Sequence, residues 1–354
     1  MIWFILFLLV LFLWIFAATK LAGPDLSQYD SAVGENFAAH ENDQPVTRTF
    51  LQSVKEVEKR AGATKSLKKG LAMVREFADN LSSGLESDSE YITTVANGVA
   101  CEWAVAPGSD PKRRILFLHG GAFLMGSPKG HRFYADRLSR IAKAAVLSVD
   151  YRMLPENNRN SASIDAQSAY HWILQHGPSG ETPLDKLLVA GDSAGGNLAL
   201  MLSGWSKTGA ARKPDAAIGF SPSLDTTLNS PTFKTNKHTD ILLGKPLGFL
   251  SRLPRTLALW FGVITMRANP SSILLSPLFG DLNDLPPTLI HASSSEVLLG
   301  DSIRYTNKAK AAGSDVTLQI WADQIHDWHI LSSGSGSANE AWSEVDKFIA
   351  EIIG

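Results

Sequence analysis

The chain has 354 residues, of which 44% are hydrophobic and 19% are charged, so it is long enough to bury a sizeable core. The formal net charge is −2 and the basic residues are scattered, which argues against nucleic acid as a partner. A single cysteine, Cys101, cannot form an intrachain disulfide, so the fold does not depend on an oxidising compartment.

The chain begins with an unbroken apolar run over residues 1–18. As a helix this run would span about 27 Å, close to the roughly 30 Å core of a bilayer. No Lys or Arg precedes it, and residues 16–18 form a poor cleavage site, so residues 1–20 are predicted to be a retained membrane anchor. The rival interpretation, a cleaved signal peptide, would give a secreted protein. The flanking charges do not fix the side of the membrane.

Residues 21–44 are polar and irregular and are predicted to form a linker. Two segments within residues 45–90 then carry apolar residues at helical spacing. These residues are Val46, Phe50, Val54 and Val57 in the first segment and Leu67, Leu71, Val74 and Leu81 in the second. The two predicted helices could pack on a core or form a cap over an active site.

Residues 91–354 alternate short β-rich runs with helical segments, which indicates βαβ units and a mostly parallel sheet. The longest interruption, residues 224–285, has an amphipathic stretch at 247–261 and is predicted to insert over the sheet. Residues 331–338 are rich in Gly and Ser and predict a loop, while an apolar face over residues 339–353 predicts a closing helix. The predicted strands are residues 115–118, 145–149, 187–190, 216–220, 288–291 and 316–321.

Residues 191–195 have the pattern G-x-S-x-G between a predicted strand and a predicted helix start. A sharp turn here would lift the Ser193 hydroxyl above the sheet, and the helix N-terminus would favour negative charge. The glycines suit such a turn because larger side chains would clash with the adjacent strand and helix. A turn without function is the alternative, but the strand–turn–helix context favours Ser193 as a nucleophile.

The segment His119-Gly120-Gly121-Ala122-Phe123 follows the first of these predicted strands. Successive glycines let backbone N–H groups point into a cavity, and a tetrahedral intermediate needs such donors about 3 Å from its oxyanion. Gly120 and Gly121 are predicted to supply two donors and Ala194 a third, which together form an oxyanion hole. A simple tight turn after a strand is the alternative.

A nucleophilic serine needs a base, and in proteins with this elbow the acid and then the histidine follow the serine along the chain. Four histidines lie after Ser193. His291 lies within a predicted strand and is expected to be structural, while His238 lies in the long insertion. His326 and His329 follow the last predicted strand, where a loop could bring an imidazole over the sheet edge.

Two carboxylates are candidates for the residue that orients the base. Glu296 follows the predicted strand at residues 288–291, and Asp301 lies five residues further on. Asp327 is adjacent to His326 in sequence and is not expected to orient it.

Several segments of the chain resemble the hormone-sensitive lipase family of carboxylesterases, also called bacterial family IV. The resemblance extends over about residues 115–330, in the order and spacing of the family. The matching segments are 119–123, 151–156, 191–199, 276–278, 296–299 and His326 before Trp328.

The resemblance implies an α/β-hydrolase fold with a mostly parallel central sheet flanked by helices. It implies a catalytic triad of Ser193 as nucleophile, Glu296 as acid and His326 as base. It also implies a helical cap built from residues 45–90 and from the insertion at 224–285.

The sequence departs from the family pattern at several positions. Ala122 takes the third position of the His-Gly-Gly motif and should not move the donors. Gly300 and Asp301 stand where the family often has two acids, which makes Asp301 the alternative acid. Ser223 stands where an aromatic residue is common, so the pocket wall there is expected to be roomier. Residues 151–156 are expected to brace the oxyanion loop.

The predicted function is hydrolysis of small-molecule carboxylic esters by a serine carboxylesterase, on small to medium acyl groups. No cofactor or metal is required by this chemistry. A lactonase or an amide or acetyl hydrolase with the same triad is the nearest alternative, and a non-catalytic ligand-binding protein is an alternative of another class. The membrane is a predicted partner through the N-terminal helix, and a homo-oligomer is possible.

Overall fold

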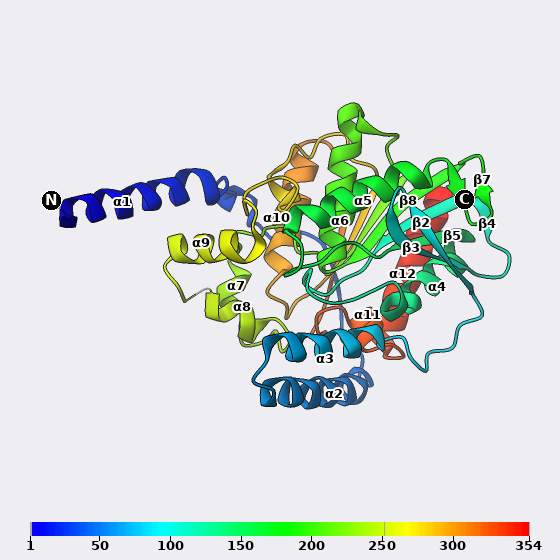
Figure 1. The fold of residues 1–354 in the computed structure, drawn as a ribbon. Helices are drawn as coiled ribbons and strands as arrows, with labels where there is room; N and C mark the ends of the chain where they lie inside the picture. Colours follow the sequence, from blue (N-terminus) through cyan, green and yellow to red (C-terminus); the bar gives the residue numbers. More distant parts are fainter. Residues whose placement is uncertain (1, 251, 354) are drawn as a thin grey trace.

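The computed structural model describes residues 2–250 and 252–353, which form a nine-stranded sheet flanked by helices (Figure 1). The strand order is β1-β11-β10-β9-β8-β4-β5-β3-β2. All neighbouring strands from β1 to β5 in this order are parallel, and β3 pairs antiparallel with both β5 and β2. The strands are β1 Glu35–Phe37, β2 Glu90–Ala96, β3 Val99–Val105, β4 Asp110–Leu118, β5 Ala144–Val149, β8 Lys186–Asp192, β9 Ala216–Phe220, β10 Thr288–Ser293 and β11 Val316–Trp321. The predicted α/β class with a mostly parallel sheet is confirmed.

The six predicted strands are present as β4, β5, β8, β9, β10 and β11. Three further strands of the nine-stranded sheet were not predicted. β2 and β3 form an antiparallel hairpin at one edge, and β1 forms the other edge within the segment predicted as an irregular linker. β1 is held there by its pairing with β11, where the rings of Phe37 and Trp321 stack with centroids 4.2 Å apart.

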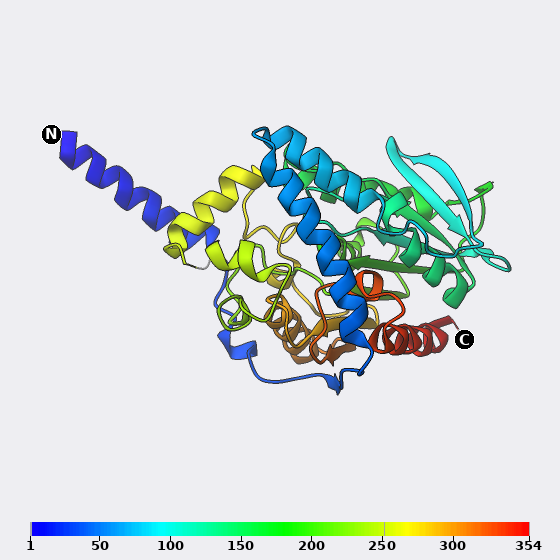
Figure 2. The same ribbon diagram turned by 90° about the horizontal axis from the view of Figure 1, so that it is seen from below.

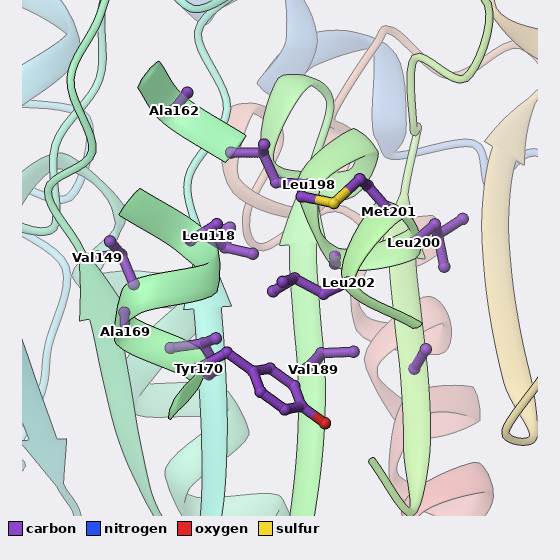
Figure 3. Close-up of a cluster of buried hydrophobic side chains, with 14 of the residues drawn as sticks. Leu118, Val149, Ala162, Ala169, Tyr170, Val189, Leu198, Leu200, Met201 and Leu202 are labelled. Carbon is purple, nitrogen blue, oxygen red and sulfur yellow. The ribbon is translucent and has the colours of Figure 1, made fainter. Parts of the chain in front are cut away.

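Helices cover both faces of the sheet because alternate residues of its strands point to opposite sides. Leu116 and Leu118 of β4 belong to the core under α5 and α6, whereas Ile115 and Phe117 belong to the core under α4 and α12. Figure 3 shows part of the first core, where Leu118 and Val189 lie beneath the helices that carry Tyr170 and Leu198. These helices are α4 Arg132–Ala142, α5 Arg159–Ile173, α6 Ala194–Trp205 and α12 Gly336–Ile353.

The closing helix begins earlier than predicted, at Gly336 rather than at residue 339. The Ser335 hydroxyl accepts the Ala338 N–H at 3.1 Å, which is the bond of a helix N-cap. Asp43 accepts the Ser337 N–H at 3.1 Å and adds a negative charge at the same end. These two bonds extend the helix into the segment that its Gly and Ser content had predicted to be a loop.

The two helices predicted in residues 45–90 are α2 Asp43–Ala63 and α3 Leu67–Asp79. They pack against each other, with the rings of Phe50 and Phe77 in contact, and Figure 2 shows them lying together across the sheet. The long insertion carries α7 Thr232–Thr235, α8 Gly244–Leu250 and α9 Arg255–Met266. The remaining helices are α10 Leu299–Ala311 and the short α11 Trp328–Leu331.

The N-terminal helix projects away from the rest of the molecule in both views (Figures 1 and 2). α1 Ile2–Phe16 continues as a π-helical turn over Ala17–Leu21, and 18 consecutive residues of this 20-residue segment have a mean hydropathy of 2.7. It is the one helix among residues 2–250 and 252–353 that is long and apolar enough to cross a bilayer. A membrane span and a signal sequence share this character.

The close packing of α6 against β4 predicts a contrast between two glycines of the same helix. A Cβ at Gly195 would lie 1.8 Å from the Leu118 carbonyl oxygen, whereas no atom lies within 4 Å of a Cβ at Gly204. We expect Gly195→Ala to lower the free energy of unfolding by about 3 kcal/mol or more, since the backbone must shift. Gly204→Ala should raise it by about 0.5–1 kcal/mol. Urea unfolding in detergent measures both, and equal effects of the two variants would contradict the packing described.

Candidate active site

Ser193 lies on the turn between β8 and α6, where the backbone leaves the sheet. Its φ of 51° and ψ of −112° lie outside the common regions, as the predicted elbow requires. A Cβ at Gly191 would lie 2.4 Å from the Gly195 carbonyl oxygen, and a Cβ at Gly195 would lie 1.8 Å from the Leu118 carbonyl oxygen. Neither of these two glycines can therefore carry a side chain. The Ser193 N–H donates to the Phe220 carbonyl of β9 at 2.8 Å. Contacts to both neighbouring strands therefore fix the turn.

Three side chains that the sequence singled out meet at this turn. His326 Nε2 lies 2.8 Å from Ser193 Oγ, and His326 Nδ1 lies 2.8 Å from Glu296 Oε2. Ser193, Glu296 and His326 follow the carboxyl ends of β8, β10 and β11. All three are buried. A hydroxyl, an imidazole and a carboxylate in this order form the arrangement in which imidazole can take the hydroxyl proton.

Glu296 is held rigidly beneath the imidazole. Its side chain is completely buried, and its second oxygen, Oε1, accepts the Ser293 N–H at 2.8 Å. One carboxylate oxygen thus binds the backbone at the end of β10, and the other faces His326. This division fixes the carboxylate against the ring.

Asp301, the alternative acid, is not near His326. Its carboxylate accepts the N–H groups of Leu224 and Asp225 at 3.0 and 2.9 Å, together with the Ser230 hydroxyl. Burial and the nearby charge of Asp225 raise the pKa of Asp301 to about 8. Asp301 therefore holds the first residues of the insertion, and the structure brings Glu296 to the histidine.

The prediction that Gly120 donates to an oxyanion is wrong. The Gly120 N–H already donates to Asp192 Oδ1 at 2.9 Å, and Gly120 does not line the cavity at Ser193. A Cβ at Gly120 would lie 2.2 Å from Asp192 Oδ2, so this glycine serves the close approach of the loop to the elbow. The other oxygen of Asp192 lies 3.3 Å from His131 Nε2.

Gly121 and its neighbour Ala122 do line the cavity together with Ser193. Gly121 has a φ of 112° and Ala122 a φ of 55°, so the backbone turns in the left-handed region here. Within the described part of the chain, the N–H groups of these two residues have no acceptor. Ala194 is the first residue of α6, so its N–H has no partner within the helix. These three residues present free N–H donors around the serine turn.

Residues 151–156 brace the oxyanion loop, as predicted. The Tyr151 hydroxyl donates to the His119 carbonyl at 2.6 Å, and the Leu154 N–H donates to the Phe123 carbonyl at 2.8 Å. Arg75 of α3, which the sequence analysis did not identify, donates to the Leu124 carbonyl at 2.8 Å and pairs with Glu156. The cap helix α3 is thereby tied to the same loop.

The cavity above Ser193 has a volume of about 340 Å³ and a mainly apolar lining. The side chains come from α2, from α3 and the turn after it, from the insertion and from α11. They include Phe50, Val54, Val57, Val74, Phe77, Leu81, Leu242, Leu243, Ile330 and Leu331. α2, α3 and the insertion thus lie over the site as a cap.

Asp327 contributes a charge to the site that the sequence analysis did not anticipate. As expected, it does not orient His326 through Nδ1, but its Oδ2 lies 3.1 Å from His326 Nε2. Burial favours the neutral imidazole, yet the charges of Asp327 and Glu296 outweigh it and hold the pKa of His326 well above its usual value. Burial also raises the pKa of Asp327 itself, to about 7.

His291 and His329 form a separate buried pair with their rings joined at 2.9 Å between Nδ1 and Nε2. Burial lowers the pKa of both imidazoles, so both are neutral and structural, as predicted for His291. No group of three or more His, Cys, Asp or Glu side chains suited to a metal ion is present in residues 2–250 and 252–353.

Comparison with known proteins places this site within a family. Residues 115–330, which contain Ser193, Glu296 and His326, match the model of a family described as having the α/β-hydrolase fold. Over 239 residues the chain is 36% identical to an acetyl-hydrolase of Streptomyces hygroscopicus, a match that covers 67% of this chain and 75% of that protein. It is also 32% identical to esterase LipU of Mycobacterium tuberculosis over 250 residues, or 71% of this chain and 82% of LipU.

Comparison with solved structures also finds similar esterases. The chain is similar to an esterase from the bacterial hormone-sensitive lipase family with a TM-score of 0.72 and 29% identity. The match covers 88% of this chain and 99% of that esterase.

The contact between Asp327 and His326 predicts a pH dependence. A general base must be neutral, so the rate of ester hydrolysis rises as the pH passes the pKa of His326. Asp327→Asn removes a charge that raises this pKa, so the acid limb of kcat/KM should move to lower pH. Asn tolerates the left-handed backbone at this position, where φ is 54°.

The control for this prediction is Asp323→Asn, which changes an exposed carboxylate in the same loop. The pH profile of kcat/KM for the control should match that of the unmodified protein. An acid limb that stays in place in Asp327→Asn would show that this carboxylate does not set the pKa of the base.

Proposed function

The chain belongs to the hormone-sensitive lipase family of α/β-hydrolase-fold carboxylesterases, and on that premise we propose that it works through an acyl-enzyme on Ser193. The relatives are esterases and acetyl-hydrolases, so the protein is a carboxylic ester hydrolase that acts on small-molecule esters, as predicted. The observation that best supports the proposed mechanism is the pair of 2.8 Å contacts from His326 to Ser193 and Glu296.

In the proposed mechanism His326 takes the Ser193 proton as Oγ attacks the ester carbonyl. Glu296 stabilises the imidazolium that forms, and the tetrahedral intermediate places its oxyanion among backbone N–H donors. We assign these donors to Gly121, Ala122 and Ala194. The imidazolium then gives its proton to the departing alcohol, and water releases the acid by the reverse sequence of steps.

The cavity supports small to medium acyl groups as the substrate class. Its volume of about 340 Å³ is near the lower end of the range of roughly 300–1,000 Å³ for ligand pockets. Its apolar lining suits an acyl chain and offers few partners to a charged group. Rates on p-nitrophenyl acetate, butyrate and octanoate test this, and a maximum at octanoate would contradict it.

Acetyl esters are a second candidate, because one similar protein is named an acetyl-hydrolase. A preference for p-nitrophenyl acetate over butyrate in the same series would favour this alternative. Parallel assays with a lactone and an acetanilide separate ester hydrolysis from the other bonds that this chemistry can break.

The catalytic assignment predicts a graded set of losses. Ser193→Ala and His326→Ala should each lower kcat/KM by about 10⁴-fold or more, because each removes a group that takes part in bond making. Glu296→Gln should lower it by about 10²–10⁴-fold, since only the support of the imidazole is lost. Activity on p-nitrophenyl butyrate measures all three variants.

Asp301→Asn is the matched control, because it changes a buried carboxylate that is bonded to Leu224, Asp225 and Ser230 and not to the proposed triad, while leaving an oxygen to accept the Leu224 N–H. Its kcat/KM per folded molecule should stay within about threefold of the parent. A larger loss in Asp301→Asn than in Glu296→Gln would overturn the acid assignment. Failure of a fluorophosphonate probe to label Ser193 would favour a non-catalytic binder.

We also propose that α1 remains in the mature protein and spans a membrane. Support comes from the length of α1 with the turn that follows it, from the mean hydropathy of 2.7 over 18 of these residues, and from the projection of α1 away from the catalytic domain. The full chain should stay in the pellet after carbonate extraction of membranes, and its intact mass should include the first residues. A mature mass that lacks residues 1–18 would instead establish a cleaved signal peptide.

A further inference from the structure

The insertion helix α9 lies against the base of α1. Ala17, Leu21 and Leu259 form a small buried cluster, and the rings of Phe16 and Trp260 stack with centroids 5.8 Å apart. The Trp260 indole N–H also donates to the Leu13 carbonyl at 3.2 Å. Both views show α9 beside the end of α1 where the helix enters the domain (Figures 1 and 2). α9 is therefore the part of the cap that a membrane around α1 would meet.

A neighbouring face of α9 is apolar and open to solvent. Leu257, Phe261 and Ile264 are 57%, 47% and 71% exposed. Their spacing of four and three residues places them in one stripe along the helix. Phe249 of the adjacent α8 is also exposed. After Arg255 the helix α9 carries no charge, so this stripe lacks the polar residues that a water-facing helix normally presents.

The insertion carries a net positive charge, although the whole chain has a net charge of −2. Residues 224–285 contain six basic residues and four acidic residues, Asp225, Asp240, Asp281 and Asp284, and so carry a net charge of +2. Asp225 is buried, and Asp281 and Asp284 pair with Lys207 and Lys213, which lie outside the insertion. The basic residues are Lys234, Lys237, Lys245, Arg252, Arg255 and Arg267. Asp240 is buried and accepts the Leu243 and Val297 N–H groups at 2.8 and 2.9 Å, so it does not offset this charge at the surface.

We propose that the α8–α9 face, defined by Phe249, Leu257, Phe261 and Ile264 with the surrounding basic residues, binds the surface of an anionic bilayer. The inference rests on the proposed role of α1 as a membrane anchor. An apolar stripe beside Lys and Arg side chains is the pattern of elements that lie in the membrane interface. The stripe enters the boundary between headgroups and acyl chains, and the basic side chains contact anionic headgroups.

This contact gives lipid-dissolved esters a route to Ser193. A groove of about 810 Å³ between α2 and α8 is lined by Lys237, Lys245, Phe249 and Arg252. Glu58 of α2 lines this groove and also the catalytic cavity, so the two meet at that residue. The proposed substrate class is therefore an ester that partitions into the bilayer.

Depth-dependent quenching tests where the face lies. Cys101 is buried, and burial raises the pKa of its thiol to about 12, so it will not compete with an introduced surface cysteine. The full chain carrying Phe261→Cys and an NBD fluorophore is reconstituted into vesicles of phosphatidylcholine and phosphatidylglycerol. Lipids with doxyl groups on their acyl chains should quench the fluorophore strongly.

Two further labelled variants calibrate the result. Ser179→Cys lies in the turn between β6 His176–Gly177 and β7 Gly180–Glu181, far from α1 in Figure 1, and should not be quenched. Leu9→Cys in the middle of α1 reports on the anchor itself. Quenching at Leu9→Cys without quenching at Phe261→Cys would overturn the docking proposal and leave the anchor intact. Absence of quenching at all three positions would overturn both.

Kinetics test the consequence for the substrate. In the full chain, Leu257→Ser/Phe261→Ser/Ile264→Ser should lower the rate on an ester dissolved in the vesicles by about fivefold or more. The rate on water-soluble p-nitrophenyl butyrate should change by less than about twofold, because the triad is untouched. Val95→Ser/Ile164→Ser removes exposed apolar side chains elsewhere and should change neither rate.

The two substrates separate this proposal from the esterase assignment. Equal rates of the triple variant and the unmodified chain on the vesicle-borne ester would overturn docking. If the unmodified chain hydrolysed neither the vesicle-borne ester nor p-nitrophenyl butyrate, the proposed esterase function itself would be contradicted. Replacing phosphatidylglycerol by phosphatidylcholine alone should weaken quenching at Phe261→Cys, and an unchanged signal would contradict the role of the basic residues.

Discussion

The active site depends on a close approach of three backbone segments that leaves no space for side chains. The end of β4, the turn after β8 and the start of α6 meet where a Cβ on Gly195 would lie 1.8 Å from the Leu118 carbonyl oxygen. The oxyanion loop joins the same contact, because Gly120 donates to Asp192, the residue before the nucleophile. Ser193 and the loop that faces it are thus positioned by one set of contacts, and a shift in either would move both.

The parallel sheet supplies the rest of the geometry. Ser193, Glu296 and His326 are far apart in sequence, but each follows the carboxyl end of a strand, and these ends lie at one edge. Buried carboxylates then act on different parts of this edge. Glu296 supports the imidazole, Asp327 adds a second negative charge beside it, and Asp301 holds the start of the insertion. Of these three carboxylates, only Glu296 is bonded to Nδ1 of His326, which is the nitrogen that an orienting acid must reach.

Local patterns in the sequence were enough to predict six strands of the sheet and the serine turn, because these follow from strongly apolar runs and a distinctive motif. The resemblance to the lipase family then selected Glu296 and His326 among the candidates that the local patterns left open. Features set by tertiary contacts were not predictable in this way. β1 has only three residues and is a strand because β11 lies beside it. The donors proposed for the oxyanion loop lie one position further along the chain than those predicted, because two adjacent glycines look alike in sequence. The left-handed turn at Gly121 and the carboxylate of Asp192 decide which N–H group is free.

The same insertion serves the cavity and the proposed membrane contact, which links the two physically. Leu242 and Leu243 line the cavity and immediately precede α8, while α9 packs on the last turn of the N-terminal helix. A tether joined to the domain by a flexible segment alone would leave the cavity free to turn in any direction. Here Trp260 and Arg255 donate to the carbonyl groups of Leu13 and Ala22, so the N-terminal segment and the cap are joined by direct contacts. The orientation of α1 in a bilayer would therefore also set the orientation of the groove that leads to Ser193.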